Sequence, residues 1–570
     1  MAPSSARSAV TAVLPIYQWL REYDPSWLRG DIVAGLTVAA AVIPEGMAYA
    51  SLAGLPPETG LYASLFAVVA YLFVGSSRQV VYGPTSALAV LLATQVRGVG
   101  AGTPAEYATL VGLTTLLVGA VALVAWLLRL GFVVNFISES VLTGFATGTA
   151  LFVVSTQLGK LVGIEGGDGT FYERVWAVVT NLASLQPETA ALGGAGLAVL
   201  LVGERSAPRF PTALVVVALS TALVAVTDLT SRGVAVVGTV PSGIPSLSVP
   251  TGSTAAVTDL FPVALALFLL SYVEGMGAVE TFARRHGYRA DANQELLATG
   301  LTNLLAGLGG GFAVGGSMSR SALNDAVGAR TQLTNGVIAV VIVVVLLFLS
   351  ELLTTLPETI LAAVVIVAVT GLVDVAGLRR LYRADRLEFL TAASALVGVL
   401  VFGVLYGVFI GVLISVLVVV GRATYPHTAE LGRVPDGTEF GDRSRHPANE
   451  RVPSVFVYRV DAELFFANAP TVRRDLLDRL DDRESAVGLV VFDLRSSPTV
   501  DLTAADMLSE LHDDLAERGI DLRLAEADGA VRDVLAATDA ADALSRFPVN
   551  ESVSGVIDRW REGDATDAKE

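Results

Sequence analysis

The sequence predicts a multi-pass α-helical membrane protein of about fourteen helices in two inverted repeats of about seven, followed by a C-terminal α/β domain. The composition is the first reason, because 53% of the 570 residues are hydrophobic and only 16% are charged, whereas soluble domains carry about 25% charged residues. The second reason is a short motif that recurs in the two halves of the apolar region. The third is a run of alternating strand-like and helix-like segments near the C-terminus.

The charge distribution divides the chain. Residues 1–429 contain 24 acidic and 21 basic residues, a net charge of −3, and residues 430–570 contain 31 and 17, a net charge of −14, which together give the total of −17. An apolar body therefore carries an acidic, water-soluble tail. The predicted boundaries are a cytoplasmic N-terminal segment at 1–29, a transmembrane domain at 30–424 with repeats near 30–205 and 206–424, a linker at 425–453, a soluble domain at 454–563 and an acidic tail at 564–570.

Apolar stretches such as 108–128 and 392–420 reach the roughly 20 residues that a helix needs to span a bilayer. No cleavable signal peptide is expected, because charges interrupt the segment before Asp31. If both termini lie in the cytoplasm, most loop arginines lie inside, as the positive-inside rule requires. The opposite loops then receive Arg97, Lys160, Arg174 and Arg232. We therefore expect a plasma-membrane protein with cytoplasmic N- and C-termini.

The composition also excludes some functions. The chain has no cysteine, so disulfides and thiolate metal sites are excluded, and four scattered histidines give little scope for a metal site. We expect no enzyme activity, no cofactor, no metal and no nucleic-acid partner. Lysine occurs only as Lys160 and Lys569. An acidic, lysine-poor surface is typical of a halophile, because negative charge keeps proteins soluble in concentrated salt.

The recurring motif is the tripeptide Glu-Gly-Met. It begins at Glu45 and again at Glu274, an offset of 229 (274 minus 45). A carboxylate in mid-membrane costs roughly 2.5 kcal/mol or more and is a functional hypothesis by default. Two of them at matching places in two halves of a membrane chain are typical of a secondary transporter.

A second pair of segments supports the repeat. Residues 81–88, with Gly83-Pro84-Thr85-Ser86, resemble residues 314–323, with Gly315-Gly316-Ser317, at an offset of 232 (315 minus 83). Proline and hydroxyl residues suit helix starts, so we expect two half-helices whose free N–H groups and positive dipole ends attract an anion. The alternative is that glycine and proline here only permit close packing or a kink.

Arg320 lies one turn into the second of these half-helices, within an otherwise apolar stretch. A buried arginine in a membrane needs an anionic partner. That partner is either the substrate or a permanent one, for which Glu274 and Asp325 are the candidates. Glu274 has two other possible roles, because it could bind a proton or Na⁺.

Glu45 follows Pro44, which is expected to break the helix and turn the carboxylate toward a cavity. A carboxyl group that is out of water holds a proton more readily, so Glu45 is a candidate proton carrier. Tyr49 lies one turn further along the same face. Its ring is either a substrate contact or a packing aromatic.

The C-terminal region alternates between the two kinds of secondary structure. Strands are predicted at 455–460, 488–494 and 520–525, and helices at 470–480, 504–518 and 529–538. This alternation favours a small α/β domain with an at least partly parallel sheet.

Several motifs resemble the signature of SulP anion transporters. They are Pro44-Glu45-Gly46-Met47-Ala48-Tyr49-Ala50, Gly75-Ser76-Ser77-Arg78, Asn293-Gln294-Glu295-Leu296, Gly315-Gly316-Ser317-Met318-Ser319-Arg320-Ser321 and Gly328-Ala329-Arg330-Thr331-Gln332. The tail is similar to a STAS domain. The resemblance implies the fold of uracil transporters, in which a core domain moves against a gate domain, and it implies a homodimer.

The resemblance also implies a substrate site between the third and tenth helices. Its lining would be Tyr49, Thr85, Ser86, Ser317, Ser319 and Arg320, with Glu45 and Glu274 as the proton- or ion-coupling residues. Family members with glutamate at the position of Glu45 resemble proton-coupled symporters. In STAS regulators a loop hydroxyl is phosphorylated; Thr503 is the nearest match, although Leu502 and Ala504 depart from the usual residues.

We therefore expect a secondary active anion transporter, a proton-coupled symporter of a sulfate-like inorganic anion or a small carboxylate that works by alternating access. One alternative is a Na⁺-coupled bicarbonate transporter, although Ala278 stands where a hydroxyl ligand is expected. An anion exchanger or channel is another. An alternative from a different class is a membrane-anchored STAS signalling protein. The identity of the anion stays open.

Overall fold

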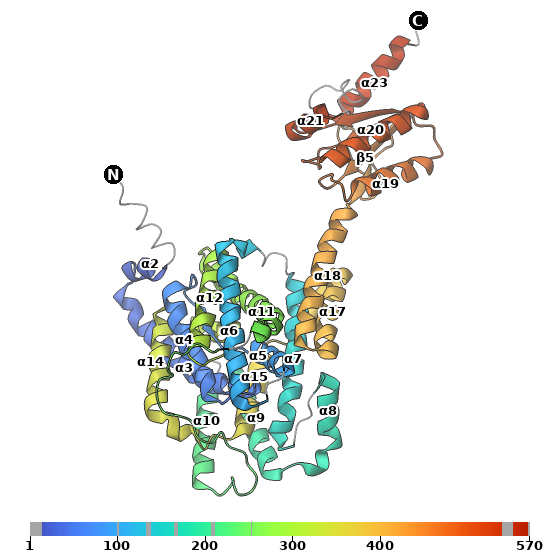
Figure 1. Ribbon diagram of the computed structural model, residues 1–570. Coiled ribbons are helices and arrows are strands. Elements are labelled where there is room, and N and C mark those ends of the chain that lie inside the picture. Colours follow the sequence, from blue (N-terminus) through green and yellow to red (C-terminus); the bar gives the residue numbers. More distant parts are fainter. Residues whose placement is uncertain are drawn as a thin grey trace, which may run out of the picture. The chain divides into compact units, whose positions relative to one another are not determined.

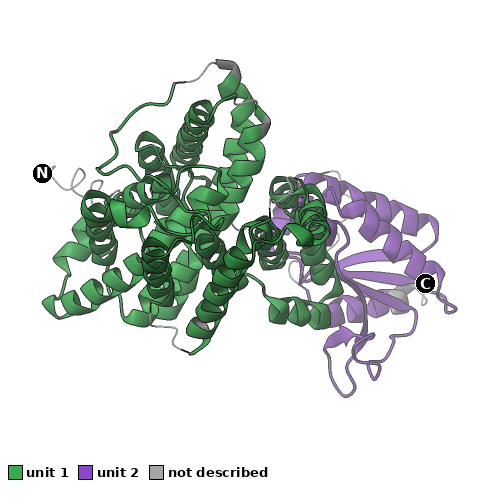
Figure 2. Cartoon of the chain, turned by 90° about the horizontal axis from the view of Figure 1, so that it is seen from below, with its two compact units in different colours: residues 1–415 green, residues 416–570 purple. Residues whose placement is uncertain are grey.

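The structure, a computed structural model, describes residues 14–99, 102–132, 138–164, 169–206, 211–251, 254–538 and 551–567. The chain consists of two compact units, residues 1–415 and residues 416–570 (Figure 2). The division between them falls inside helix α18, Val404–Thr424.

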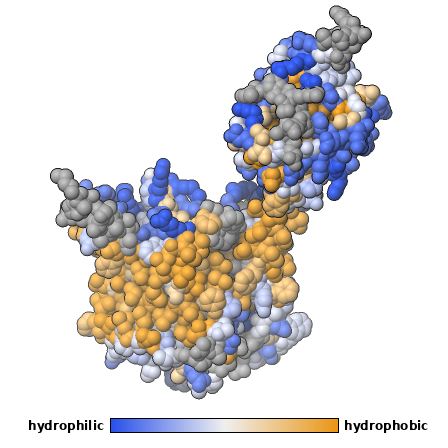
Figure 3. Space-filling model, turned by 45° about the horizontal axis from the view of Figure 1, so that its top comes forward, coloured by the Kyte–Doolittle hydropathy of each residue, from blue (hydrophilic) through white to orange (hydrophobic). Residues whose placement is uncertain are grey.

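Unit 1 is built almost entirely of helices. Within the described residues, seven helices are long and apolar enough to cross a membrane, and four shorter apolar helices accompany them. Apolar side chains form a broad belt across the face of unit 1 seen in Figure 3, with hydrophilic residues on both sides of it. This surface confirms the prediction of a multi-pass membrane protein.

The same order of elements occurs twice in unit 1 (Figure 1). After the short α2, Ile16–Arg21, the first half contains α3 Leu28–Leu52, α4 Glu58–Val74, β1 Val81–Gly83, α5 Ser86–Val96, α6 Pro104–Leu127, α7 Glu139–Val162, α8 Phe171–Thr180, α9 Pro187–Ser206 and α10 Thr212–Val226. The second half contains α11 Thr254–His286, α12 Ala292–Leu308, β2 Gly315–Ser317, α13 Met318–Val327, α14 Leu333–Val344, α15 Glu358–Thr370, α16 Val375–Ala384, α17 Arg386–Phe402 and α18. In each half a strand leads into the third membrane helix, and a short helix, α8 or α16, separates the fifth from the sixth.

The two halves meet at a two-stranded antiparallel ribbon. β1 pairs with β2 in a register that places Tyr82 opposite Gly316 and Gly83 opposite Gly315. Apart from the short α8 and α16, each half has seven membrane helices within the described residues, an odd number, so the second half begins on the opposite side of the membrane. The antiparallel pairing of the equivalent strands β1 and β2 agrees with this inversion. The predicted inverted repeat is therefore confirmed.

The glycines of both Glu-Gly-Met motifs lie where the backbone comes close to its neighbours. A Cβ atom on Gly46 would lie 3.1 Å from the carbonyl oxygen of Gly60 in α4. A Cβ atom on Gly275 would lie 2.5 Å from the hydroxyl oxygen of Tyr82, which is fully buried. Small residues allow membrane helices to approach each other closely, so each glycine brings the adjacent glutamate into the packed interior.

The expectation that Pro44 breaks its helix is wrong. α3 is continuous from Leu28 to Leu52 and contains Pro44 in its interior. Proline removes one backbone hydrogen bond, but membrane helices tolerate this loss where packed neighbours and local adjustments satisfy the freed carbonyl. Pro44 is itself buried.

Unit 2 contains a five-stranded sheet in the order β4-β3-β5-β6-β7. Its strands are β3 Thr428–Arg433, β4 Phe440–Asp442, β5 Val455–Val460, β6 Leu489–Asp493 and β7 Asp521–Ala525, and its helices are α19 Ala469–Asp481, α20 Leu502–Glu517, α21 Gly529–Ala536 and α23 Val553–Asp567. β5, β6 and β7 are parallel, whereas β3 is antiparallel to both β4 and β5. The predicted α/β domain with a partly parallel sheet is confirmed.

The sheet of unit 2 is covered on both faces. Phe456, Tyr458 and Phe492 belong to one apolar cluster with side chains of α19, α20 and α21. Val457 and Val491 belong to a second cluster with the side chains of α23. Side chains alternate between the two faces of a strand, which explains why β5 and β6 carry apolar side chains on both faces and have only Arg459 and Asp493 as charged residues.

The prediction of a linker at 425–453 is wrong, because this segment contributes β3 and β4 to the sheet. Only Ala429 and Leu431 of β3 are apolar and buried, and charged residues lie between and after them. β3 lies next to the edge strand β4, and strands near an edge carry more charge than central ones. The weak apolar pattern therefore concealed both strands.

Glu430 of β3 is the centre of an ion-pair cluster in unit 2. Its carboxylate contacts Arg443 at 3.3 Å, Arg451 at 2.9 Å and also Arg483. The Arg483 side chain is only 6% exposed and lies over the ring of Phe456. Burial alone would raise the pKa of Glu430, but hydrogen bonds and charges of Arg451 and Arg483 outweigh it and hold the pKa below its ordinary value.

We expect Glu430→Gln to destabilise β3 and β5 by on the order of 3 kcal/mol, because it leaves Arg483 buried without its charge partner. The lowered pKa means that the effect is complete above the ordinary glutamate value of about 4.3 and is lost as the pH falls through the folded-state value. The loss of stability is measured by amide hydrogen exchange of β3 and β5 in the full-length protein. The exchange rates are normalised at each pH to those of the unfolded chain. The control is Glu484→Gln, at an exposed position; equal effects of the two variants would contradict the assignment.

Candidate functional site

The two half-helices begin on either side of the β1–β2 ribbon. Thr85 caps α5, where its Oγ1 accepts a hydrogen bond from the N–H of Leu88 at 3.4 Å. Ser317 caps α13, where its Oγ accepts from the N–H of Arg320 at 3.4 Å. The two caps are 232 residues apart (317 minus 85), which equals the offset found between the two segments in the sequence. Each half therefore contributes one helix N-terminus to the centre of unit 1.

Arg320 connects the two half-helices. It belongs to the first turn of α13, its side chain is 1% exposed, and its Nη2 donates a hydrogen bond of 2.7 Å to the carbonyl oxygen of Pro84. Gly83 makes room for the guanidinium group, because a Cβ atom there would lie 2.9 Å from Nη1. The cation of the second half therefore lies against the start of α5 in the first half.

Two of the donor groups of Arg320 are unsatisfied. Its Nε and Nη1 atoms are buried and have no hydrogen-bond partner. A buried donor without a partner costs about 1–3 kcal/mol, and more when it is charged. An anion at this position would satisfy both groups and neutralise the charge.

Asp325, one of the two candidates for a permanent partner of Arg320, pairs with other residues instead. Asp325 lies near the end of α13, where it forms ion pairs with Arg285 at 2.9 Å and His286 at 2.6 Å. Both of these residues belong to the last turn of α11. Asp325 therefore holds the ends of α11 and α13 together, about one and a half turns away from the level of Arg320.

Glu274 joins α11 to the start of α5. The Thr85 hydroxyl donates a hydrogen bond of 3.0 Å to its Oε2, and the charge of Arg320 also acts on the carboxylate. The capping hydroxyl of the first half therefore contacts the carboxylate of the Glu-Gly-Met motif of the second half. The Glu274 carboxylate is therefore near the Arg320 guanidinium, but its hydrogen bond goes to Thr85 and it forms no direct ion pair with Arg320.

Tyr49 and Glu45 complete the cluster from α3. Tyr49 is 6% exposed, and the charges of Glu45, Arg320 and Glu274 all act on its hydroxyl group. Glu45 is partly buried one turn earlier. Two carboxylates, one guanidinium and one phenol therefore surround the two helix N-termini, a set that can hold an anion and a proton at the same place.

Comparison with known proteins identifies the family. The sequence profile of the sulfate permease family matches residues 28–395. The chain belongs to this family. The profile of the STAS domain matches residues 446–554, so the permease carries a STAS domain in unit 2.

Related sequences cover nearly the whole permease. A probable sulfate transporter of Mycobacterium tuberculosis is 40% identical over 541 residues, which cover 95% of this chain and 97% of the relative. Sulfate transporter 1.3 of Arabidopsis thaliana is 30% identical over 574 residues, which cover 96% of this chain and 87% of that protein.

Solved structures share the fold of the permease. Murine solute carrier 26 family member A9, an anion transporter, superimposes with a TM-score of 0.88 at 21% identity, over 98% of this chain and 95% of that one. The transmembrane domain of the cyanobacterial bicarbonate transporter BicA superimposes with a TM-score of 0.60 at 20% identity, over 69% of this chain and 98% of that domain.

The structure brings most of the predicted site residues of the permease together. Contacts or electrostatic interactions connect Glu45, Tyr49, Thr85, Glu274 and Arg320. The remaining residues occupy the two helix starts: Ser86 is buried in the first turn of α5, Ser317 caps α13, and Ser319 is exposed in the first turn of α13. Thr503 is exposed in the first turn of α20 in unit 2.

Sequence reasoning missed two buried carboxylates that support the site. Asp31 in α3 is fully buried and accepts hydrogen bonds from the N–H groups of Arg330 and Thr331, at 2.7 and 3.1 Å. Glu295 in α12 is also fully buried and accepts from the hydroxyl groups of Ser76 and Tyr71, at 2.7 and 3.1 Å. Each carboxylate comes directly before an apolar stretch, and Glu295 belongs to one of the family motifs. These were the signals available before the partners were known.

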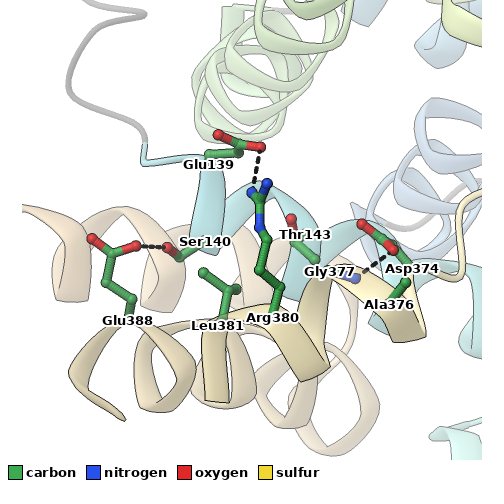
Figure 4. Close-up of a pocket in the computed structure, with 9 residues that line it drawn as sticks. All are labelled: Glu139, Ser140, Thr143, Asp374, Ala376, Gly377, Arg380, Leu381 and Glu388. Atoms are coloured by element: carbon green, nitrogen blue, oxygen red, sulfur yellow. Dashed lines mark hydrogen bonds and ion pairs between the residues drawn. The ribbon is translucent and has the colours of Figure 1, made fainter. Parts of the chain in front are cut away.

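A separate pocket of about 390 Å³ lies where α7, α16 and α17 meet (Figure 4). It is lined by Glu139, Ser140, Thr143, Asp374, Ala376, Gly377, Arg380, Leu381 and Glu388. None of the predicted site residues belongs to this lining, so the pocket is distinct from the cluster around Arg320.

Proposed function

We propose that this permease is a proton-coupled symporter of a sulfate-like inorganic anion or a small carboxylate. The observation that carries the proposal is the buried guanidinium of Arg320, which lies at the junction of two helix N-termini with two donor groups unsatisfied. A planar guanidinium group can donate two hydrogen bonds to two oxygens of the same anion. It therefore suits an oxyanion, which has several acceptor oxygens, better than it suits a monatomic anion such as chloride. The names of the relatives, which are sulfate transporters, support an anionic substrate of this kind.

Glu45 is the proposed proton carrier. It lies on the same face of α3 as Tyr49. The charges of Glu45 and Arg320 both act on the Tyr49 hydroxyl group, so the two charged groups lie near the same point. Protonation of Glu45 removes one negative charge from the surroundings of the anion, so the proton and the anion favour each other's binding. This mutual preference is the basis of symport.

Glu274 has an organising role in this proposal. Its hydrogen bond from Thr85 fixes the start of α5 beside α11. Thr85 and Glu274 are also oxygen ligands of the kind that Na⁺ accepts, so Na⁺-coupled bicarbonate transport is the alternative that the geometry supports next. Alternating access by motion between two groups of helices belongs to the same proposal and is supported by the inverted repeat. The arginine-rich loops support cytoplasmic termini. A homodimer is part of the proposal because membership of the family implies it.

Uptake into liposomes that contain the purified protein tests the proposal. Radiolabelled sulfate, bicarbonate, chloride and a dicarboxylate are compared at acidic and neutral external pH, with Na⁺ or choline as the external cation. We expect one oxyanion to accumulate against its gradient at acidic external pH, with either cation. Accumulation that requires Na⁺ would favour the bicarbonate alternative, and equilibration without accumulation would indicate a channel.

A further inference from the structure

α16 carries an unusual concentration of positive charge. The helix runs from Val375 to Ala384 and separates α15 from α17. Arg379, Arg380 and Arg383 belong to it, and Arg386 is the first residue of α17. At a rise of about 1.5 Å per residue, a helix of this length is too short to span a bilayer. Its exposed arginines, which are costly inside the hydrocarbon region, place it at a membrane surface.

These arginines differ in their partners. Arg380 extends toward α7, where it forms an ion pair of 3.3 Å with Glu139 (Figure 4). The side chains of Arg379, Arg383 and Arg386 are exposed, and no ion pair joins them to any residue in the described ranges. Arg379 and Arg383 are four positions apart and so lie on the same face of the helix.

The carboxylates near α16 accept hydrogen bonds from backbone and hydroxyl groups of the protein. Asp374 caps α16 by accepting a hydrogen bond of 2.7 Å from the N–H of Gly377. Asp385 caps α17 by accepting from the N–H of Leu387 at 2.8 Å. Glu388 accepts a hydrogen bond of 2.7 Å from the Ser140 hydroxyl. These carboxylates anchor the ends of the two helices rather than the exposed arginines.

Apolar side chains flank the exposed arginines. Val375 is 58% exposed and Tyr382 is 56% exposed on α16, and Leu387 and Leu390 are exposed on the adjoining turns of α17. A helix with exposed arginines, an exposed tyrosine and exposed aliphatic residues is typical of the membrane interface. The apolar side chains enter the acyl region while the guanidinium groups reach the level of the headgroups.

The equivalent helix of the other half provides an internal comparison. α8 lies between the fifth and sixth membrane helices of the first half, as α16 does in the second. It also exposes interfacial side chains, with Tyr172 58% and Trp176 69% exposed, but Arg174 is its sole basic residue. An interfacial helix therefore does not need a basic face. The positive-inside rule accounts for an excess of basic residues on the cytoplasmic side, but not for two exposed arginines on one helix face beside exposed apolar side chains.

We propose that Arg379 and Arg383 bind the phosphate of an anionic phospholipid headgroup, with Arg386 adding to the positive field. The bilayer supplies this ligand directly beside the exposed apolar residues of α16 and α17, and two guanidinium groups on one helix face can both donate to one phosphate. A soluble anion would gain nothing from Val375, Tyr382 or Leu390. The lipid thereby anchors the connection between α15 and α17 at one membrane surface.

Lipid titration of the purified full-length protein, followed by native mass spectrometry, tests this inference. Phosphatidylglycerol and phosphatidylcholine are titrated separately. Each basic residue near a membrane surface contributes about 1 kcal/mol to binding of anionic lipid, so we expect Arg379→Gln/Arg383→Gln to weaken phosphatidylglycerol binding about tenfold or more. Binding of phosphatidylcholine is expected to stay unchanged, and Arg379→Lys/Arg383→Lys is expected to retain most of the affinity.

The matched control is Arg284→Gln/Arg289→Gln, which removes two exposed arginines from the end of α11 and the loop that follows. It should leave phosphatidylglycerol binding within about twofold of the parent, because Arg284 already pairs with Glu280 at 3.4 Å and no large apolar side chain is exposed among residues 280–290. An unchanged affinity in the α16 variant, or an equal loss in the control, would overturn the inference. Displacement of phosphatidylglycerol by inorganic phosphate at similar concentration would show a site for free anions instead, and would also overturn it.

Discussion

Arg320→Gln is expected to reduce anion uptake at low substrate concentration by about a hundredfold or more, because hydrogen bonds to a charged group are worth about 1.5–3 kcal/mol each. The variant loses both the positive charge and the two donors that face no protein acceptor. Initial rates of uptake into liposomes, measured with the anion that the parent transports best, give the effect. Arg320→Lys should restore only part of the activity, since an ammonium group cannot reproduce the planar fork.

The stability of the same variant separates a role in binding from a role in folding. A buried guanidinium with unsatisfied donors destabilises the empty protein, so Arg320→Gln should have a thermal midpoint equal to or above that of the parent. Arg284→Gln, at an exposed arginine paired with Glu280, is the control for charge removal and should transport normally. A folded Arg320→Gln variant with parental uptake would show that the guanidinium does not bind the substrate.

Glu45→Gln is expected to abolish uptake driven by a proton gradient while leaving exchange of labelled for unlabelled anion. Glutamine resembles the protonated carboxyl in shape and charge, so the anion still meets a neutral group, but no proton can be released on the other side. The measurement is accumulation at acidic external pH in parallel with counterflow at equal pH on both sides. The effect on accumulation should be complete, because coupling needs a group that changes its protonation state.

Glu58→Gln serves as the matched control for this variant. Glu58 is the first residue of α4 and makes no contact with the cluster around Arg320, so its loss should leave coupling intact. If Glu45→Gln still accumulates anion in response to a proton gradient, the proton is carried elsewhere, and Glu274→Gln becomes the next variant to measure. Loss of both accumulation and exchange in Glu45→Gln would assign the residue to substrate binding instead of coupling.

Local signals in the sequence were sufficient for the elements of the site. Thr85 and Ser317 were expected at helix starts because hydroxyl side chains cap helices, and both occupy cap positions. The offset of 232 between the two segments reappears as the spacing of these caps. The inversion was expected because each half has about seven membrane helices, and an odd number makes the second half begin on the opposite side of the membrane.

The errors have physical causes that local patterns do not contain. Pro44 was expected to end a helix, but packing around it allows α3 to continue. The segment at 425–453 was expected to be a linker, because β3 near the sheet edge shows only two buried apolar side chains. In both cases the surroundings supplied by distant residues outweighed the preference of the segment.

The amino-acid sequence was enough to establish the membrane helices, the inverted halves, the half-helix starts and the charged residues that belong near them. These features depend on hydrophobic length, helix capping and the cost of a charge in lipid, all of which act within a short segment. The partners of those charges emerged only from the folded chain. Thr85 meets Glu274 across 189 positions and Arg320 meets Pro84 across 236, and no local preference reports which of several nearby groups a long side chain reaches. The unsatisfied donors of Arg320, which carry the functional proposal, are a property of that three-dimensional arrangement.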